Sequence, residues 1–264
     1  MARPVLALVT DFGTRDHYAG TMKGVALGIC PEATIVDITH DVPPHDVIGG
    51  ALELAAAYRY FPAGTIFLVV VDPGVGSSRR GIAAEAGDFK FVAPDNGVLT
   101  LVLDETPAKK IVELTERRYA RPTVSRTFEG RDRFAPAAAW LAKGVELSAL
   151  GRPAGSIHRL EIPHPTATAD ALNGQVLRID RFGNLITNID RKTFQRLAQD
   201  AAFEISVGSH LVPRVVSTYA DVPAGEICAL FGSTDHLEIA ANGRSAAAEP
   251  RLERGAAVHV ARRA

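Results

Sequence analysis

Apolar and polar stretches alternate along the first 160 residues in a way that predicts strands and helices in turn. Unbroken β-branched runs are typical of strands buried on both faces, and apolar positions at helical spacing follow several of them. We expect strands at residues 5–9, 34–38, 66–71, 81–84, 89–92 and 110–114, and helices at residues 18–29, 47–60, 98–103 and 136–143. The β-α-β-α-β order with short loops predicts an α/β unit with a mostly parallel sheet flanked by helices.

The pattern changes after about Leu160. Residues 162–168 contain two prolines and little periodicity, which indicates a linker. Short strands with glycine or polar punctuation follow, and they predict a smaller all-β domain, a barrel or a sandwich. We expect these strands at residues 174–180, 185–189, 203–207, 212–216, 227–231, 237–241 and 257–260. The predicted domains are residues 1–162, an N-terminal α/β catalytic domain, and residues 170–264, a C-terminal β domain.

Composition narrows the class of protein. The 264 residues are 47% hydrophobic and 22% charged, as in ordinary soluble globular proteins. A formal net charge of -1 argues against a nucleic-acid partner. Two cysteines cannot build a disulfide framework and fit a reducing compartment. No apolar run approaches the roughly 18 residues of a membrane span, so we expect a soluble cytoplasmic protein without membrane contact.

Carboxylates follow two of the predicted strands directly. Asp11 comes after the first strand, and Asp72 ends the buried run at 66–71. The carboxyl ends of strands are where open α/β sheets bind ligands. Glycines between residues 73 and 76 allow close backbone approach, and Arg79 adds positive charge soon after. A plain turn that begins with Asp is the alternative interpretation of this stretch.

A second polar segment, TFEGRDRFAP at residues 127–136, directly precedes a predicted helix that is rich in alanine. Helix capping by Thr127 or Asp132 is the simple structural interpretation. Glu129, in the same segment, is also a candidate for chemistry.

Acidic and histidine side chains also crowd the loops near strand ends. Their spacing matches no recognised zinc pattern, and hydrophilic loops account for them equally well. We therefore predict no metal site among Asp11, Asp16, His17, His40, Asp41, His45 and Asp46.

Six motifs occur in order over nearly the whole chain: TDFGTRD, VVVDPGVGSSRR, APDNG, TFEGRDRFAP, DRFGNLITN and FGSTDHLEIAANG. Together they resemble the S-adenosyl-L-methionine hydrolases, or hydroxide adenosyltransferases, which are relatives of the fluorinase and chlorinase enzymes. The resemblance implies an α/β domain followed by a β-barrel domain. It also implies a homotrimer that holds its small-molecule substrate between neighbouring subunits. The implied reaction converts S-adenosyl-L-methionine and water to adenosine and L-methionine, without a cofactor.

The resemblance also implies roles for single residues. The family's catalytic Asp, Arg and His fall on Asp72, Arg79 and position 129. In the first domain, the implied substrate contacts are Asp11 and Asp16, for the ribose hydroxyls and the methionine end. In the second domain, Asp180 is implied for the methionine amino group and Ser233 for the methionine carboxylate. Phe182 and Asn184 fall in a loop that contacts the ligand, and Asn242 falls in a loop that lines the adenine.

Position 129 departs from the family pattern, because TFHGRD is TFEGRD in this chain. A carboxylate close to Asp72 should raise one of the two pKa values, and Glu129 has the reach to replace the histidine as proton acceptor or water positioner. Two alternatives stay open: a halide-using adenosyltransferase, and a protein that binds S-adenosyl-L-methionine or adenosine without turnover. Asp72 disfavours the first alternative because a carboxylate would repel a halide.

Overall fold

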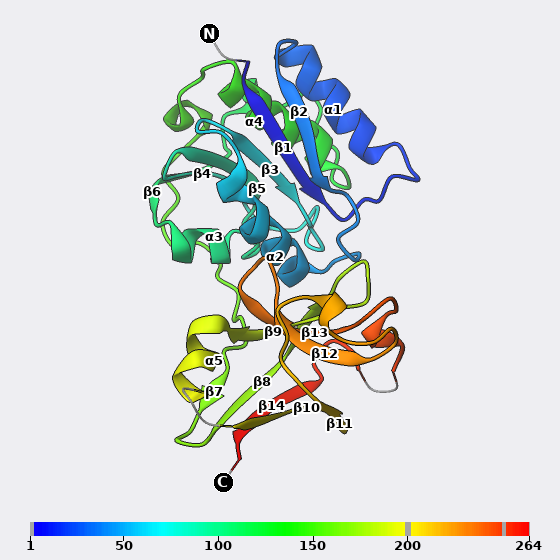
Figure 1. The fold of residues 1–264 in the computed structure, drawn as a ribbon. Coiled ribbons are helices and arrows are strands. Elements are labelled where there is room, and N and C mark those ends of the chain that lie inside the picture. The colour runs from blue at the N-terminus through cyan, green and yellow to red at the C-terminus, as the bar shows by residue number, and fades with distance from the viewer. Residues whose placement is uncertain (1–2, 199–201, 250–251, 264) are drawn as a thin grey trace. The chain divides into compact units, whose positions relative to one another are not determined.

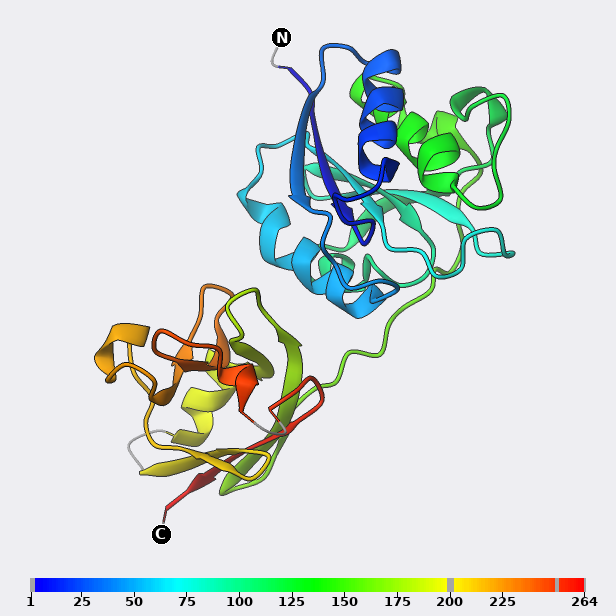
Figure 2. The same ribbon diagram turned by 90° about the vertical axis from the view of Figure 1, so that its right-hand side faces the viewer.

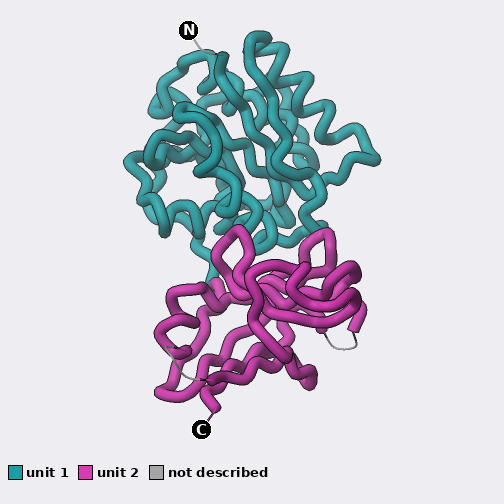
Figure 3. The backbone as a smooth tube through the Cα atoms, viewed as in Figure 1, with its two compact units in different colours: residues 1–161 teal, residues 162–264 magenta. Residues whose placement is uncertain are grey.

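A six-stranded sheet organises residues 1–161, the first of two compact units into which the chain divides at residue 162 (Figure 3). The computed structural model describes residues 3–198, 202–249 and 252–263. The sheet has the order β2-β1-β3-β5-β4-β6. Its strands are β1 Val5–Thr10, β2 Thr34–Thr39, β3 Ile66–Val70, β4 Gly81–Ala86, β5 Phe89–Pro94 and β6 Ala108–Glu113.

The pairings β2–β1, β1–β3 and β3–β5 are parallel, and β5–β4 and β4–β6 are antiparallel. The prediction of a mostly parallel sheet flanked by helices is confirmed. The helices are α1 Tyr18–Ile29, α2 Val47–Ala57, α3 Thr100–Glu105 and α4 Ala135–Ala142, and short 3₁₀ turns extend α2 and connect other elements.

The helices cover both faces of the sheet (Figures 1 and 2). On one face, Leu68 and Val70 of β3 join a core that includes residues of α1 and α4. On the other face, Phe67 and Val69 join a core that includes residues of α2 and α3. Side chains alternate between the faces of a strand, so the apolar run of β3 is buried on both sides. The parallel strands β1, β3 and β5 therefore end at one edge, which positions the loops that follow them.

The second unit, residues 162–264, is an antiparallel barrel-like sheet in the order β11-β10-β14-β8-β9-β13-β12, with β7 paired to β8. The end strands β11 and β12 contact each other, and Val215 bridges to Ala229, so the sheet nearly closes on itself. Its strands are β7 Thr166–Ala167, β8 Ala171–Ile179, β9 Leu185–Asp190, β10 Phe203–Val207, β11 His210–Val212, β12 Ile227–Phe231, β13 His236–Ala241 and β14 Ala257–Arg262.

Three details of this unit differ from the sequence prediction. The short strand β7 lies within residues 162–168, which were expected to be a linker. The helix α5, Arg191–Ala198, was not expected, and it packs Phe194 and Leu197 into the core of the second unit. The strand expected at 212–216 is wrong, because β11 ends at Val212. Among the described helices of both units, none combines the length and the apolar character needed to span a membrane.

Candidate active site

Asp72 and Arg79 form a two-point ion pair just beyond the carboxyl end of β3. Arg79 donates from Nε to Oδ1 of Asp72 at 2.9 Å and from Nη2 to Oδ2 of the same carboxylate. The Asp72 side chain is 5% exposed and that of Arg79 is 10% exposed. A bidentate pair of this kind sets the orientation of the carboxylate and favours its ionised form.

The loop from Asp72 to Arg79 is held in a compact shape by its own backbone. Val75 N donates to Asp72 O at 3.2 Å, and Ser77 N donates to Gly74 O at 3.1 Å. Gly76 has a φ of +78°, and a Cβ there would lie 2.3 Å from Arg126 O. Glycine is thus required where this loop touches the segment that leads to Glu129.

Glu129 joins the same cluster from another part of the chain. Its Oε2 accepts a hydrogen bond from Nη2 of Arg79 at 2.7 Å, and its side chain is 11% exposed. The next five residues, Gly130–Phe134, form a π-helical turn before α4, a distortion that is frequent at functional sites. Gly130 lies against α1 and β3, where a Cβ would approach Met22 Sδ to 3.0 Å. This close packing brings Glu129 to the end of β3.

The electrostatics of the cluster are set by burial and by one shared cation. Burial raises the pKa of Asp72 and the charge of Glu129 raises it further, which together outweigh the opposing effect of Arg79. Burial opposes the charge of Arg79, but the two carboxylates raise its pKa above the usual arginine value. The Arg79 guanidinium also lies 5.1 Å from the ring centre of Phe134. The expectation that the pair would raise one carboxylate pKa applies to Asp72.

Arg133 approaches Glu129 from one helical turn further on. Its Nη2 lies 3.8 Å from Oε1 of Glu129, while Oε2 of Glu129 is the oxygen that Arg79 contacts. The sequence analysis assigned no role to Arg133. The i,i+4 spacing of an acidic and a basic residue before a helix is the signal that could have identified it.

The other predicted residues of the first unit lie in the loop after β1. Asp11 is partly buried, and its Oδ2 accepts a hydrogen bond from the backbone N of His45 at 2.9 Å. Asp16 is exposed. Because β1 and β3 are parallel neighbours, Asp11 and Asp72 follow strand ends at the same edge of the sheet. Asp132 is buried and serves the local fold, accepting a hydrogen bond from Ser125 N and pairing with Arg131.

The predicted residues of the second unit fall mainly in two turns. Asp180 organises the turn after β8: its Oδ1 accepts from the backbone N of Phe182 and of Asn184, and its Oδ2 accepts from the Asn184 side chain, each at 2.9 Å. Phe182, between them, is 76% exposed. Ser233 lies in the turn between β12 and β13. Asn242 follows β13, and its side chain donates to Val222 O at 2.7 Å.

The described residues offer no metal-binding arrangement. Those residues contain no group of three or more His, Cys, Asp or Glu side chains placed to hold a metal ion. His40, one of the histidines considered from the sequence, is buried and bonds through Nδ1 to Thr10 Oγ1 at 2.8 Å. The two cysteines are unpaired and buried.

A helix-flanked sheet with a buried carboxylate and arginine cluster at its carboxyl edge, followed by a barrel-like unit, defines a two-domain α/β enzyme. The models of the SAM hydroxide adenosyltransferase N-terminal and C-terminal domains match residues 6–151 and 174–259. The chain belongs to the SAM hydroxide adenosyltransferase family.

Individual relatives agree with this assignment. The chain is 40% identical to an (R)-S-adenosyl-L-methionine hydrolase of Salinispora tropica, over 92% of each chain. It is 39% identical to an enzyme of the same name from Thermus thermophilus, over 98% of this chain and 99% of the other. A fluorinase of Nocardia brasiliensis is 31% identical over 98% and 97% of the two chains. The crystal structure of an uncharacterized conserved protein from Thermotoga maritima superposes with a TM-score of 0.91 at 38% identity, covering 98% of this chain and all of the other.

Proposed function

We propose that this chain hydrolyses S-adenosyl-L-methionine to adenosine and L-methionine, by attack of water on the ribose C5′ carbon. The observation that carries the mechanism is the bridge that Arg79 makes between Asp72 and Glu129. The substrate carries a sulfonium, so the leaving group departs as a neutral thioether and needs no acid. The enzyme has to position a water molecule in line with the C5′–S bond and accept one proton.

Asp72 is proposed to orient the attacking water. Both of its oxygens face Arg79, which fixes the carboxylate plane and leaves the outer lone pairs for a water hydrogen. The side chain is largely buried, so a water held there is removed from bulk solvent. Positioning and desolvation of this kind supply a large share of the rate in such displacements.

Glu129 is proposed to accept the proton. Its Oε2 accepts a hydrogen bond from Arg79 at 2.7 Å, whereas Arg133 lies 3.8 Å from Oε1, beyond hydrogen-bond distance. Oε1 therefore keeps lone pairs that can accept a hydrogen bond from the attacking water. Glu129 would thus replace the family's histidine with a carboxylate. The reaction consumes water and releases one proton to solvent, and in this scheme it uses no cofactor.

Substrate binding is proposed to use both units. Asp11 and Asp16 would accept hydrogen bonds from the ribose hydroxyls and the methionine end, as the family resemblance implies. The second unit would contribute Asp180 and Ser233 toward the methionine end, Phe182 and Asn184 from the turn after β8, and Asn242 near the adenine.

We further propose a homotrimer in the cytoplasm, with each substrate held between one subunit's first unit and its neighbour's second unit. The exposed Phe182 ring is an apolar surface that such a site would cover. The two unpaired cysteines fit a reducing compartment. Light scattering on the purified protein tests the assembly, with a mass of three chains expected and a monomer contradicting it.

A halide-using adenosyltransferase is the second candidate, because fluorinases are among the relatives. Asp72 disfavours it, since a buried carboxylate at the attacking position repels an anion. The test is incubation with S-adenosyl-L-methionine, with and without chloride, followed by chromatography. Adenosine in both samples supports hydrolysis, and 5′-chloro-5′-deoxyadenosine in the chloride sample supports the alternative. Calorimetric binding of S-adenosyl-L-methionine without any product would indicate a binding protein instead.

A further inference from the structure

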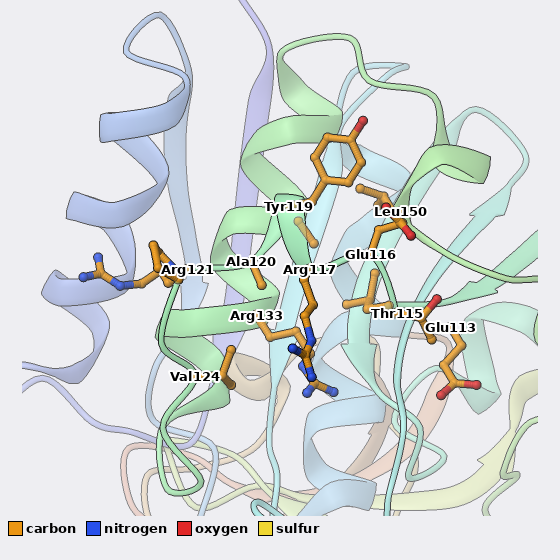
Figure 4. A pocket seen from close by; sticks show the side chains of 13 residues that line it. Glu113, Thr115, Glu116, Arg117, Tyr119, Ala120, Arg121, Val124, Arg133 and Leu150 are labelled. Carbon is orange, nitrogen blue, oxygen red and sulfur yellow. The ribbon is translucent and has the colours of Figure 1, made fainter.

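A cavity of about 540 Å³ lies in the first unit beside the π-helical turn (Figure 4). The segment from Glu113 to Val124 forms much of its wall, and Arg133, Ala137 and Leu150 complete it. Its volume falls within the range of roughly 300–1,000 Å³ that is usual for small-molecule sites. None of the residues that we assign to substrate or catalysis lines it.

The carboxylates in the wall already have cationic partners outside the cavity lining. Glu113 pairs with Arg152 at 2.9 Å, and Glu116 pairs with Arg118 at 3.5 Å. Among the residues that line the cavity, three arginines outnumber the two glutamates. The cavity carries an excess of positive charge at its wall.

Two of the three lining arginines supply this charge. Arg121 pairs with the buried Asp132 at 3.2 Å and points away from the cavity in Figure 4. Arg117 and Arg133 extend toward its centre in the same view. Within the part of the chain that the structure describes, Arg117 has no carboxylate partner within 4 Å, and Arg133 has only Glu129 at 3.8 Å. Two guanidinium groups without a close counterion favour an anion between them.

We propose that this cavity binds a small phosphate monoester, with its phosphate between Arg117 and Arg133 and its organic part in the space that remains. Guanidinium groups match the geometry of phosphate oxygens, and the cavity is larger than a phosphate alone requires. The site takes an effector and not the sulfonium substrate, which the same positive charge repels.

Arg133 connects this cavity to the catalytic cluster. It lines the cavity, and its Nη2 also lies 3.8 Å from Oε1 of Glu129. A phosphate that attracts the Arg133 guanidinium moves it relative to Glu129, so occupancy changes the rate of the hydrolysis proposed above. This coupling rests on the proposed function, whereas binding of the anion does not.

Binding is tested by calorimetric titration of the full chain with inorganic phosphate and with phenyl phosphate, at constant ionic strength set by chloride. Saturable binding is expected, tighter for phenyl phosphate than for inorganic phosphate. Arg117→Ala should weaken it at least tenfold. Arg3→Ala, which removes the same charge from an exposed position outside the cavity, should leave it unchanged. The site is refuted if wild type shows no saturable binding, or if both variants bind as wild type does.

Coupling is tested by measuring hydrolysis of S-adenosyl-L-methionine with and without saturating phenyl phosphate. A change of at least twofold in kcat is expected for wild type and for Arg3→Ala, and none for Arg117→Ala, whose basal kcat should match wild type. An equal response in Arg117→Ala would overturn the coupling. Absence of hydrolysis in every sample would refute the proposed function, while the calorimetric result would still decide whether the anion site exists.

Discussion

Arg79 Nη2 lies 2.7 Å from Oε2 of Glu129, although the two residues are separated by fifty positions in the chain. The same guanidinium holds Asp72, so one cation serves two buried carboxylates. Such a cluster carries one net negative charge when both acids are ionised. It can orient a water molecule with one carboxylate and take a proton with the other.

Glu129→Gln should lower kcat by about 10²–10⁴, the usual cost of a lost general base. The amide is nearly isosteric and can still accept a hydrogen bond from Arg79, so the melting temperature should stay close to that of wild type. Glu129→His restores the family residue and should recover much of the lost rate. Turnover is measured by chromatography of adenosine, and an unchanged kcat in Glu129→Gln would reject the proton-acceptor role.

The acidic limb of the pH profile should depend on Asp72. Burial first, and the Glu129 charge in addition, raise the pKa of Asp72, so the ionised form that orients water is lost at a higher pH than for an ordinary aspartate. In Glu129→Gln the added charge is absent. The variant's residual kcat/KM should therefore fall off at a lower pH than that of wild type. A limb that stays in place, or moves upward, would contradict the assignment of that limb to Asp72.

Phe182→Ala should raise KM for S-adenosyl-L-methionine without changing the melting temperature. The ring is 76% exposed and so contributes little to the fold. If it contacts the ligand, its loss should cost about 1–3 kcal/mol, the range found for stacking on a nucleobase, which is a factor of roughly 5 to 150 in affinity. Tyr60→Ala, at a similarly exposed aromatic that we assign no role, is the control. Equal KM values for both variants and wild type would remove Phe182 from the site.

Glu238→Gln should stabilise the second unit at neutral pH. Burial raises the pKa of Glu238, so the folded chain binds this proton more tightly than the unfolded chain does. Stability is then lost as the pH rises from the ordinary glutamate value through the raised one. Glutamine removes this penalty and can still accept the hydrogen bond from Tyr219.

The melting temperature of Glu238→Gln should exceed that of wild type by a few degrees at pH 7, since about 1 kcal/mol shifts it by roughly 2–4 °C in a chain of this size. At pH 4, where Glu238 is mostly protonated in both states of wild type, the difference between the two melting temperatures should be much smaller. A variant less stable than wild type at pH 7 would contradict the pKa argument. Scanning calorimetry at both pH values provides the measurement.

The sequence predicted the first unit well because its signals are local. The run at 66–71 is buried on both faces, and a strand buried in this way leaves a continuous apolar segment. The helix α1 matches its predicted bounds, Tyr18–Ile29. In the second unit the short helix α5 was missed, although Asp190 caps it by accepting from Thr193 N at 2.8 Å, a capping signal that the sequence contains.

The candidate site could be only partly predicted. Asp72 and Arg79 are near in sequence, and their pairing follows from one loop. The arrangement around Glu129 depends on Gly130 packing against Met22, and no local pattern contains that contact. For the same reason the anion cavity was not foreseen, because Arg117 and Arg133 come from segments that only the folded chain brings together.

The most direct test of water attack at C5′ is hydrolysis of S-adenosyl-L-methionine in H₂¹⁸O. The products are separated, and their masses are measured by mass spectrometry. The mechanism predicts one ¹⁸O atom in the 5′-hydroxyl of adenosine, none gained by methionine, and loss of this product in Asp72→Asn. Methylthioadenosine with labelled homoserine, or unlabelled adenosine, would mean that water does not attack that carbon.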